Sequence, residues 1–182
     1  MHWSTRFLGS VCLLGAVTGC QPNGFSLFRD EPKLDDSSAL SGPLVEVNGT
    51  SLGQRIANHQ GQVVLVDYWA TWCPPCRAAF PHSVELGTRY ASQGLKFIAV
   101  SLDARGQHHE AASFVATHGA NVESYVSEYG SGSRSFEEFR IDSGAIPYYQ
   151  LYDRRGELRY TFTGSSPEIE TRLQELLQEP AA

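Results

Sequence analysis

The sequence lacks several features that would mark a nucleic-acid-binding or a membrane-spanning protein. Its 182 residues contain no run of lysine and arginine, and 20 acidic against 14 basic residues give a net charge of −6. Nucleic-acid-binding domains usually carry a basic stripe, so nucleic acid is not an expected partner. The apolar run 7–17 is shorter than the about 20 residues needed to cross a bilayer, and no later segment approaches that length. The length favours a single domain.

Cysteines are also few, and they do not form a structural disulfide framework. Arg6, the apolar run 7–17 and the small residues before Cys20 are typical of a signal peptide. Cys12 would leave with this segment, so Cys73 and Cys76 form a single close pair in the remaining domain. In an exported, disulfide-permissive protein such a pair is more naturally catalytic than structural.

The segment Val17-Thr18-Gly19-Cys20 resembles a bacterial lipobox, in which the signal is cut before the cysteine and that cysteine is acylated. The alternative is an ordinary signal peptide with a chance cysteine. We therefore expect a lipoprotein signal peptide at 1–19, a flexible tether at 20–43 and a folded domain at 44–182. The protein would be anchored by lipid on Cys20 in the bacterial cell envelope, with its domain facing the periplasm or extracytoplasmic space.

The sequence also lacks a convincing metal or cofactor motif. His108 and His109 have no cysteine or carboxylate partner at ligand spacing, and zinc on the cysteine pair would need two more ligands. The segment Gly130-Ser131-Gly132-Ser133 lacks the remaining glycine of a dinucleotide-binding fingerprint. We expect no metal and no cofactor other than a redox-active disulfide between Cys73 and Cys76.

The hydrophobic pattern predicts an α/β domain with a central mixed sheet and helices on both of its faces. The Asn48-Gly49 pair predicts a turn that joins short strands at 44–47 and 50–52 into a hairpin. The apolar run 63–69 predicts a buried central strand that leads into a helix ending near Ser92 and kinked at Pro81. The remaining expected elements are a strand at 96–102, a helix around 111–118, a strand at 121–126, a helical turn at 136–140, a hairpin of 148–152 with 158–162, and a helix over 169–177.

The cysteine pair lies at the junction of the buried strand and the following helix, in Trp72-Cys73-Pro74-Pro75-Cys76. The helix N-terminus favours a thiolate, which lowers the pKa of the Cys73 thiol below its usual value of about 8.5. We expect Cys73 to be exposed and to attack. Cys76, one helical turn further, would be shielded from solvent and would resolve the mixed disulfide.

The segment 66–77, with Pro81 after it, resembles the active-site segment of thioredoxins. Gly144-Ala145-Ile146-Pro147 before a hairpin, and the turn 153–156, are similar to the TlpA/ResA branch of exported thioredoxin-like proteins. The resemblance covers about residues 44–178. It implies a thioredoxin-like fold and a thiol-disulfide oxidoreductase.

The same resemblance implies roles for residues around the cysteines. Pro147 would be a cis-proline that faces the cysteines, although a trans turn proline is far more common in general. Ile146 would offer backbone hydrogen bonds to a bound substrate. Trp72 would stack near the substrate groove or simply cover the helix start. Pro74 and Pro75, between the cysteines, are expected to tune the pair.

Asp67 matches the buried carboxylate of thioredoxins, which exchanges a proton with the resolving cysteine. Its apolar neighbours give a physical reason for a raised pKa, whereas a strand-end aspartate facing solvent is the alternative. The sequence departs from the family at Ala79, where many relatives carry glutamate, so proton transfer would fall to Asp67 alone. It also has Tyr148-Tyr149-Gln150 where relatives often carry threonine and small or apolar residues.

The resemblance favours a reductase of client proteins with disulfides or thiols, rereduced by a membrane electron donor, in cytochrome c or metalloprotein maturation. The motif itself does not fix the direction of electron flow. A thiol peroxidase of the related fold is disfavoured because Ala70 stands where those enzymes carry threonine. A thioredoxin-shaped binding module without turnover is the other alternative.

Overall fold

The computed structural model describes residues 44–119 and 121–180. The predicted signal peptide 1–19, the tether 20–43 and the acylated Cys20 lie outside the described residues. Within the part that is described, no helix is both long enough and apolar enough to cross a membrane.

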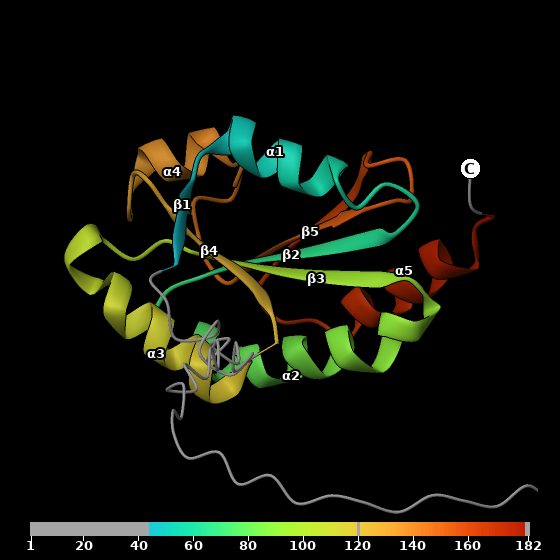
Figure 1. The fold of residues 1–182 in the computed structure, drawn as a ribbon, viewed down its shortest axis with the longest axis horizontal. Coiled ribbons are helices and arrows are strands. Elements are labelled where there is room, and N and C mark those ends of the chain that lie inside the picture. Colours follow the sequence, from blue (N-terminus) through green and yellow to red (C-terminus); the bar gives the residue numbers. More distant parts are fainter. Residues whose placement is uncertain (1–43, 120, 181–182) are drawn as a thin grey trace, which may run out of the picture. The chain divides into compact units, whose positions relative to one another are not determined.

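A six-stranded mixed sheet forms the centre of the domain, in the order β1-β4-β3-β2-β5-β6 (Figure 1). The first four strands in this order run parallel, and β5 and β6 are antiparallel to their neighbours. The strands are β1 (Val45–Val47), β2 (Val63–Trp69), β3 (Leu95–Ser101), β4 (Glu123–Ser127), β5 (Tyr148–Tyr152) and β6 (Leu158–Thr163). The mixed sheet and the β5–β6 hairpin confirm the sequence prediction.

Helices cover both faces of this sheet, as predicted. On one face lie α1 (Gly49–Ala57) and α4 (Ser133–Glu138), and on the other lie α2 (Pro74–Tyr90), α3 (His108–His118) and α5 (Glu168–Gln178) (Figure 1). Short 3-10 turns follow α2 at Ala91–Gln93 and precede α3 at Arg105–Gln107. Pro81 lies inside α2, which continues past it to Tyr90.

The central strand β2 is buried along its whole length because both of its faces are covered. Its alternate residues enter two different cores, since successive side chains of a strand point to opposite faces. Leu65 and Trp69 pack with residues of α2 and α5, whereas Val64, Val66 and Tyr68 pack with residues of α1 and the segment after α4. By this alternation Asp67 faces the α2 side.

The predicted hairpin at 44–52 is wrong in its second half. β1 pairs in parallel with β4, and the chain then enters α1 instead of turning back. Asn48 is the N-cap of this helix: its side chain accepts from Ser51 N, and Ser51 Oγ accepts from Asn48 N, both at 2.9 Å. Asparagine before glycine is a turn signal, but asparagine is equally a preferred N-cap, and here the reciprocal capping box decides the outcome.

Candidate active site

The site is built where β2 ends and α2 begins. The backbone N–H of Leu102, just after β3, donates to Trp69 O at 2.8 Å, which ties the ends of the two parallel strands together. The chain then turns through Ala70, Thr71 and Trp72, and Cys73 is the N-cap of α2. Cys73 therefore lies at the carboxyl edge of the sheet and at the start of a helix.

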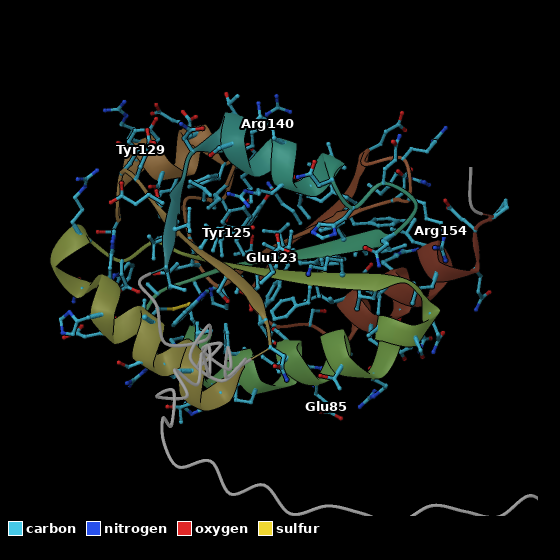
Figure 2. All side chains as sticks on the ribbon, viewed as in Figure 1. Glu85, Glu123, Tyr125, Tyr129, Arg140 and Arg154 are labelled. Carbon is cyan, nitrogen blue, oxygen red and sulfur yellow. A yellow bond between two sulfur atoms is a disulfide. The ribbon has the colours of Figure 1, made fainter. Side chains whose placement is uncertain are left out.

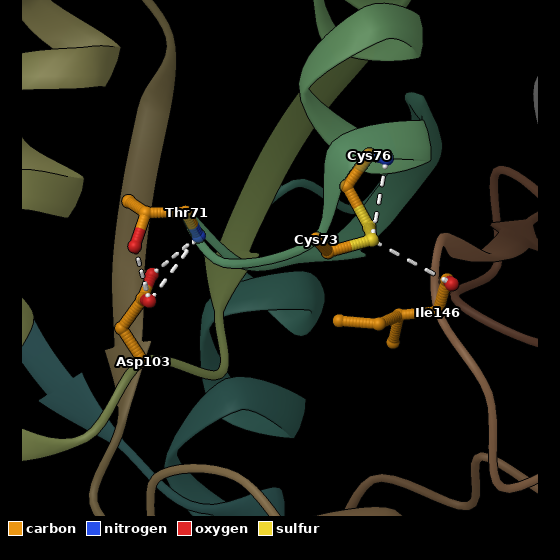
Figure 3. The surroundings of a disulfide bond; sticks show 5 residues. All are labelled: Thr71, Cys73, Cys76, Asp103 and Ile146. Carbon is orange, nitrogen blue, oxygen red and sulfur yellow. Dashed lines mark hydrogen bonds between the residues drawn. A yellow bond between two sulfur atoms is a disulfide. The ribbon is translucent and has the colours of Figure 1, made fainter.

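Cys73 and Cys76 form a disulfide with an S–S distance of 2.06 Å (Figure 3). The backbone N–H of Cys76 donates to Cys73 Sγ at 3.3 Å. Pro74 and Pro75 occupy the first positions of α2 and have no N–H, so Cys76 supplies the first free donor of the helix. The N-terminus of α2 thus offers Cys73 one backbone donor where most helices offer several.

The prediction that Cys73 is exposed is wrong in this disulfide form. Only 5% of Cys73 and 1% of Cys76 are exposed, while Trp72 beside them is 47% exposed. Cys73 lies under the loop that carries Ile146, whose carbonyl oxygen is 3.7 Å from Cys73 Sγ. The attacking and resolving assignment, which rests on Cys73 at the start of α2 and Cys76 one turn inside it, stays a prediction.

The loop opposite the cysteines contains a cis peptide bond between Ile146 and Pro147, as the family resemblance implied. The Ile146 carbonyl points toward Cys73 (Figure 3). A sulfur in a disulfide has no proton to donate, so this is a contact and not a hydrogen bond. The Pro147 carbonyl accepts from Gly164 N at 2.8 Å, which fixes the loop to the end of β6.

Asp67 is buried, with 1% of its surface exposed, and the alternative of a solvent-facing aspartate is excluded. Burial raises the pKa of Asp67 from 3.8 to about 7, and a hydrogen bond from Ser83 of α2 offsets part of this effect. Its Oδ1 atom has no hydrogen-bond partner among the described residues. The predicted raised pKa is confirmed, and a carboxyl with this pKa exchanges protons readily near neutral pH.

Two positions at which the sequence departs from the resembled family lie on β5 and α2. Tyr149 pairs directly with Asp67 across β5 and β2, and burial together with the charge of Asp67 raises the pKa of its phenol. Ala79 is 9% exposed and places a methyl group where many relatives carry glutamate. The position therefore contributes no second proton acceptor.

Asp103 is the residue of this site that the sequence analysis missed. It is completely buried just beyond the end of β3, and its carboxylate accepts hydrogen bonds from Thr71 (Figure 3). The sequence signal that could identify it is an acidic residue within two positions of the end of a strongly apolar strand. That Thr71 is the partner of Asp103, by contrast, follows only from the parallel alignment of β2 and β3.

Trp72, which precedes Cys73 in the chain, lies on the surface of the site. Trp72 lines a groove of about 560 Å³ against α3, together with Phe114 and His109. The role of Trp72 beside a bound substrate stays a prediction. Within residues 44–119 and 121–180, no three His, Cys, Asp or Glu side chains gather as metal ligands.

Comparisons with known proteins agree with this geometry. A model of the Redoxin family matches residues 37–177. The chain is 25% identical over 132 residues to the thiol-disulfide oxidoreductase ResA of Geobacillus kaustophilus, covering 67% of each chain. It is 30% identical over 123 residues to a thiol:disulfide interchange protein DsbE homolog of Paracoccus denitrificans, covering 65% of this chain and 64% of that one.

The fold is also that of a solved thioredoxin family protein. The structure of a thiol:disulfide interchange protein from Chlorobium tepidum superimposes with a TM-score of 0.54 at 24% identity, covering 66% of this chain and 83% of that chain. This confirms the predicted thioredoxin-like fold. Across three curated relatives, the matched part spans 26% to 67% of their length.

Proposed function

Because the chain belongs to the Redoxin family, we propose that it is a thiol-disulfide oxidoreductase that acts on protein disulfides, in the direction of reduction. The observation that carries this proposal is the disulfide of Cys73 and Cys76 at the N-cap of α2, directly beside the cis Ile146–Pro147 bond. The names of the relatives from Geobacillus kaustophilus and Paracoccus denitrificans support the same chemistry.

The reaction begins with the reduced pair. The Cys73 thiolate attacks one sulfur of a client disulfide, a new S–S bond forms, and the other client sulfur leaves as a thiolate that takes up a proton. The Cys76 thiolate then attacks Cys73 Sγ, which releases the second client thiol and leaves the Cys73–Cys76 disulfide. Two electrons pass from the pair to the client. A thiol donor returns the pair to its reduced form.

Asp67 serves the second step as the proton acceptor of Cys76. Both residues face the layer between β2 and α2, and the pKa of Asp67, about 7, suits a base at neutral pH. Ala79 supplies no alternative carboxylate at the family position. Ile146 and Pro147 would align the client backbone beside Cys73, and Trp72 would cover the client side chain next to it. Pro74 and Pro75 tune the pair by withholding backbone donors from Cys73.

The cellular setting follows from the N-terminal sequence. Acylation of Cys20 after removal of 1–19 would tether the domain through 20–43 to a bacterial membrane, facing the periplasm or extracytoplasmic space. A membrane electron donor would then rereduce the pair. Mass spectrometry of the mature N-terminus tests this part separately, because an unmodified Cys20 contradicts it.

Trapping of mixed disulfides tests the order of the two cysteines. We expect a Cys76→Ser variant to accumulate mixed disulfides with clients, because Cys73 still attacks and nothing resolves the product. A Cys73→Ser variant is the matched control and should accumulate none. Equal trapping by the two variants contradicts the assignment.

Turnover tests the function itself. The reduced protein should speed the reduction of insulin disulfides by dithiothreitol, and the Cys73→Ser variant should abolish this effect. Turnover of peroxide without a protein disulfide would instead identify a thiol peroxidase. No turnover of either substrate would identify a binding module.

The reduction potential tests the direction. A reduction potential near that of thioredoxin, about −270 mV, supports a reductase. A reduction potential near that of strong oxidants, about −120 mV, means that the pair oxidises its clients.

A further inference from the structure

We infer that Asp103 is a positioning residue for the cysteine pair and acts on it through Thr71. This inference rests on the proposed function, since it concerns how the same pair is held for attack. It assigns a role to a buried carboxylate that does not touch the reacting sulfur atoms.

Asp103 holds the loop before the cysteines through hydrogen bonds to Thr71. Its Oδ2 atom accepts from Thr71 N at 3.0 Å, and its Oδ1 atom accepts from Thr71 Oγ1 at 2.6 Å. Ser101 Oγ donates to the same carboxylate at 2.6 Å and accepts from Asp103 N at 3.0 Å. The carboxylate is thus fixed to the end of β3 on one side and holds Thr71 on the other (Figure 3).

Burial strengthens the hydrogen bonds by which the Asp103 carboxylate holds the loop. Asp103 is 0% exposed, so water cannot replace a hydrogen bond that the loop gives up. A buried carboxylate that loses a donor is left without compensation for its lost hydration. The loop therefore resists any displacement of Thr71 away from β3.

Thr71 stands two residues before Cys73, in the part of the loop that leaves the strand. The backbone bond from Leu102 N to Trp69 O holds the end of β2 but does not reach the loop. The Thr71 contacts extend the connection to β3 beyond the strand. They set where Cys73 Sγ lies relative to the N-terminus of α2.

The position of Cys73 matters unusually in this chain. With Pro74 and Pro75 in the first turn, the single N–H of Cys76, 3.3 Å away, carries the stabilisation of a Cys73 thiolate by α2. A charge-assisted hydrogen bond weakens as its atoms separate. Loosening the loop should therefore destabilise the thiolate and raise the pKa of the Cys73 thiol.

This expectation separates positioning from a direct effect of charge. If Asp103 acted only as a nearby negative charge, its removal would stabilise the thiolate and lower the pKa of Cys73. If it served only the stability of the fold, the pKa of Cys73 would not change. Only a positioning role predicts that the pKa of the Cys73 thiol rises.

The test measures the alkylation rate of Cys73 by iodoacetamide against pH, in the reduced full chain, with mass spectrometry of the peptide that contains Cys73. We expect Asp103→Asn and Thr71→Val each to lower the rate at pH 7 by about tenfold, the change that accompanies a pKa rise of about one. Thr71→Val keeps the charge of Asp103 and removes one bond. Thr71→Ser keeps both bonds and should restore the parent rate within about twofold.

Asp153 provides the matched control. It is also a buried carboxylate with several donors, but it follows β5 near the start of β2, at the opposite end of that strand from Thr71. Asp153→Asn should lower the free energy of unfolding and leave the alkylation rate of Cys73 unchanged. A loss of rate in this control would show that general destabilisation is sufficient and would overturn the inference.

An unchanged or lowered pKa of Cys73 in Thr71→Val also overturns the inference. That variant decides the matter if Asp103→Asn does not fold. The alkylation assay needs no client and no electron donor, so its outcome stands even if the protein fails to reduce insulin. Failure of the positioning role and failure of the proposed function are therefore distinguishable.

Discussion

Asp67 shows how a single buried side chain acquires a property that its residue type does not have in water. Its pKa of about 7 comes first from burial, and Ser83 opposes the shift without cancelling it. The folded protein therefore holds a proton that the unfolded chain loses at a much lower pH. This has a direct consequence for stability.

We expect Asp67→Asn to be more stable than the parent at pH 8. Between about pH 4 and pH 7 the folded protein binds more protons at Asp67 than the unfolded chain does, so the stability of the parent falls as the pH rises through this window. Above pH 7 the charged Asp67 lowers the free energy of unfolding of the parent by up to about 4 kcal/mol, and below pH 4 this loss vanishes. Denaturant unfolding of the oxidised protein at pH 8 and at pH 4 measures it.

Ser83→Ala is the companion variant for this prediction. It removes the hydrogen bond that lowers the pKa of Asp67, so the pKa should rise further. Titration of the carboxyl signal by nuclear magnetic resonance follows the change. A parent and an Asp67→Asn variant with the same pH dependence of stability would contradict the raised pKa.

The residues of the site differ in how far the sequence could reveal them. The cysteine pair, Asp67 and Pro147 sit in local motifs, and the structure contains the predicted strand-to-helix junction, the buried carboxyl and the cis peptide bond. The burial of Cys73 was missed because it depends on the loop around Ile146, which is remote in sequence. Asp103 was missed because its partner is fixed only once β2 and β3 lie side by side.

Secondary-structure elements were predictable where one strong pattern acted alone. The run 63–69 and the helix after the cysteines gave β2 and α2 close to their observed bounds. At Asn48 two local signals competed, and contacts from distant residues support the helix: Gly49 N donates to Glu138 Oε1 at 3.0 Å, and Asn48 Nδ2 donates to Glu128 Oε2 at 3.2 Å. Such contacts cannot be read from the neighbouring sequence.

The packing of α2 on β3 leads to a prediction at Gly87. Replacing a helical glycine by alanine usually stabilises a helix by about 1 kcal/mol. Here a Cβ on Gly87 would lie 2.8 Å from Phe97 Cβ, which is too close for two carbon atoms and cannot be relieved by a side-chain rotation. We expect Gly87→Ala to lower the free energy of unfolding by about 1–2 kcal/mol.

Gly53 of α1 is the control for this substitution, because a Cβ there meets nothing within 4 Å. Gly53→Ala should stabilise the protein by up to about 1 kcal/mol. Thermal or denaturant unfolding compares the two variants. Stabilisation by both would mean that α2 can move away from β3 at little cost.

At the scale of the whole molecule, Arg154 joins segments from four parts of the chain. It lies in the β5–β6 turn, close to the end of α5 (Figure 2). Its guanidinium donates to Gly61 O at 2.8 Å, to Gln93 O at 3.3 Å and to Leu177 O at 3.0 Å. These carbonyls belong to the loop before β2, the turn before β3 and the last turn of α5.

We expect Arg154→Ala to lower the free energy of unfolding by about 1–2 kcal/mol, because three carbonyls lose a charged donor, and of the three hydrogen bonds only the one to Leu177 O is partly buried. Arg154→Lys should recover only part of the loss, since an ammonium group cannot reach the three carbonyls with the geometry of a guanidinium fork. Equilibrium unfolding in urea measures both.

The effect should be confined to stability. The turn lies at the end of β2 opposite the cysteines, so the reduction potential of the Cys73–Cys76 pair should not change in Arg154→Ala. A shifted potential would mean that the two ends of the sheet are coupled.

The placement of the tryptophans gives the domain an optical reporter of its own state. Trp69 and Trp72 are the two tryptophans among the described residues; Trp69 shares a buried cluster with both cysteines, and Trp72 adjoins Cys73 in the chain. Disulfides quench the excited state of a nearby indole, whereas thiols do so less. The emission of this domain therefore comes almost entirely from the surroundings of its redox centre, and reduction should brighten it without any added dye.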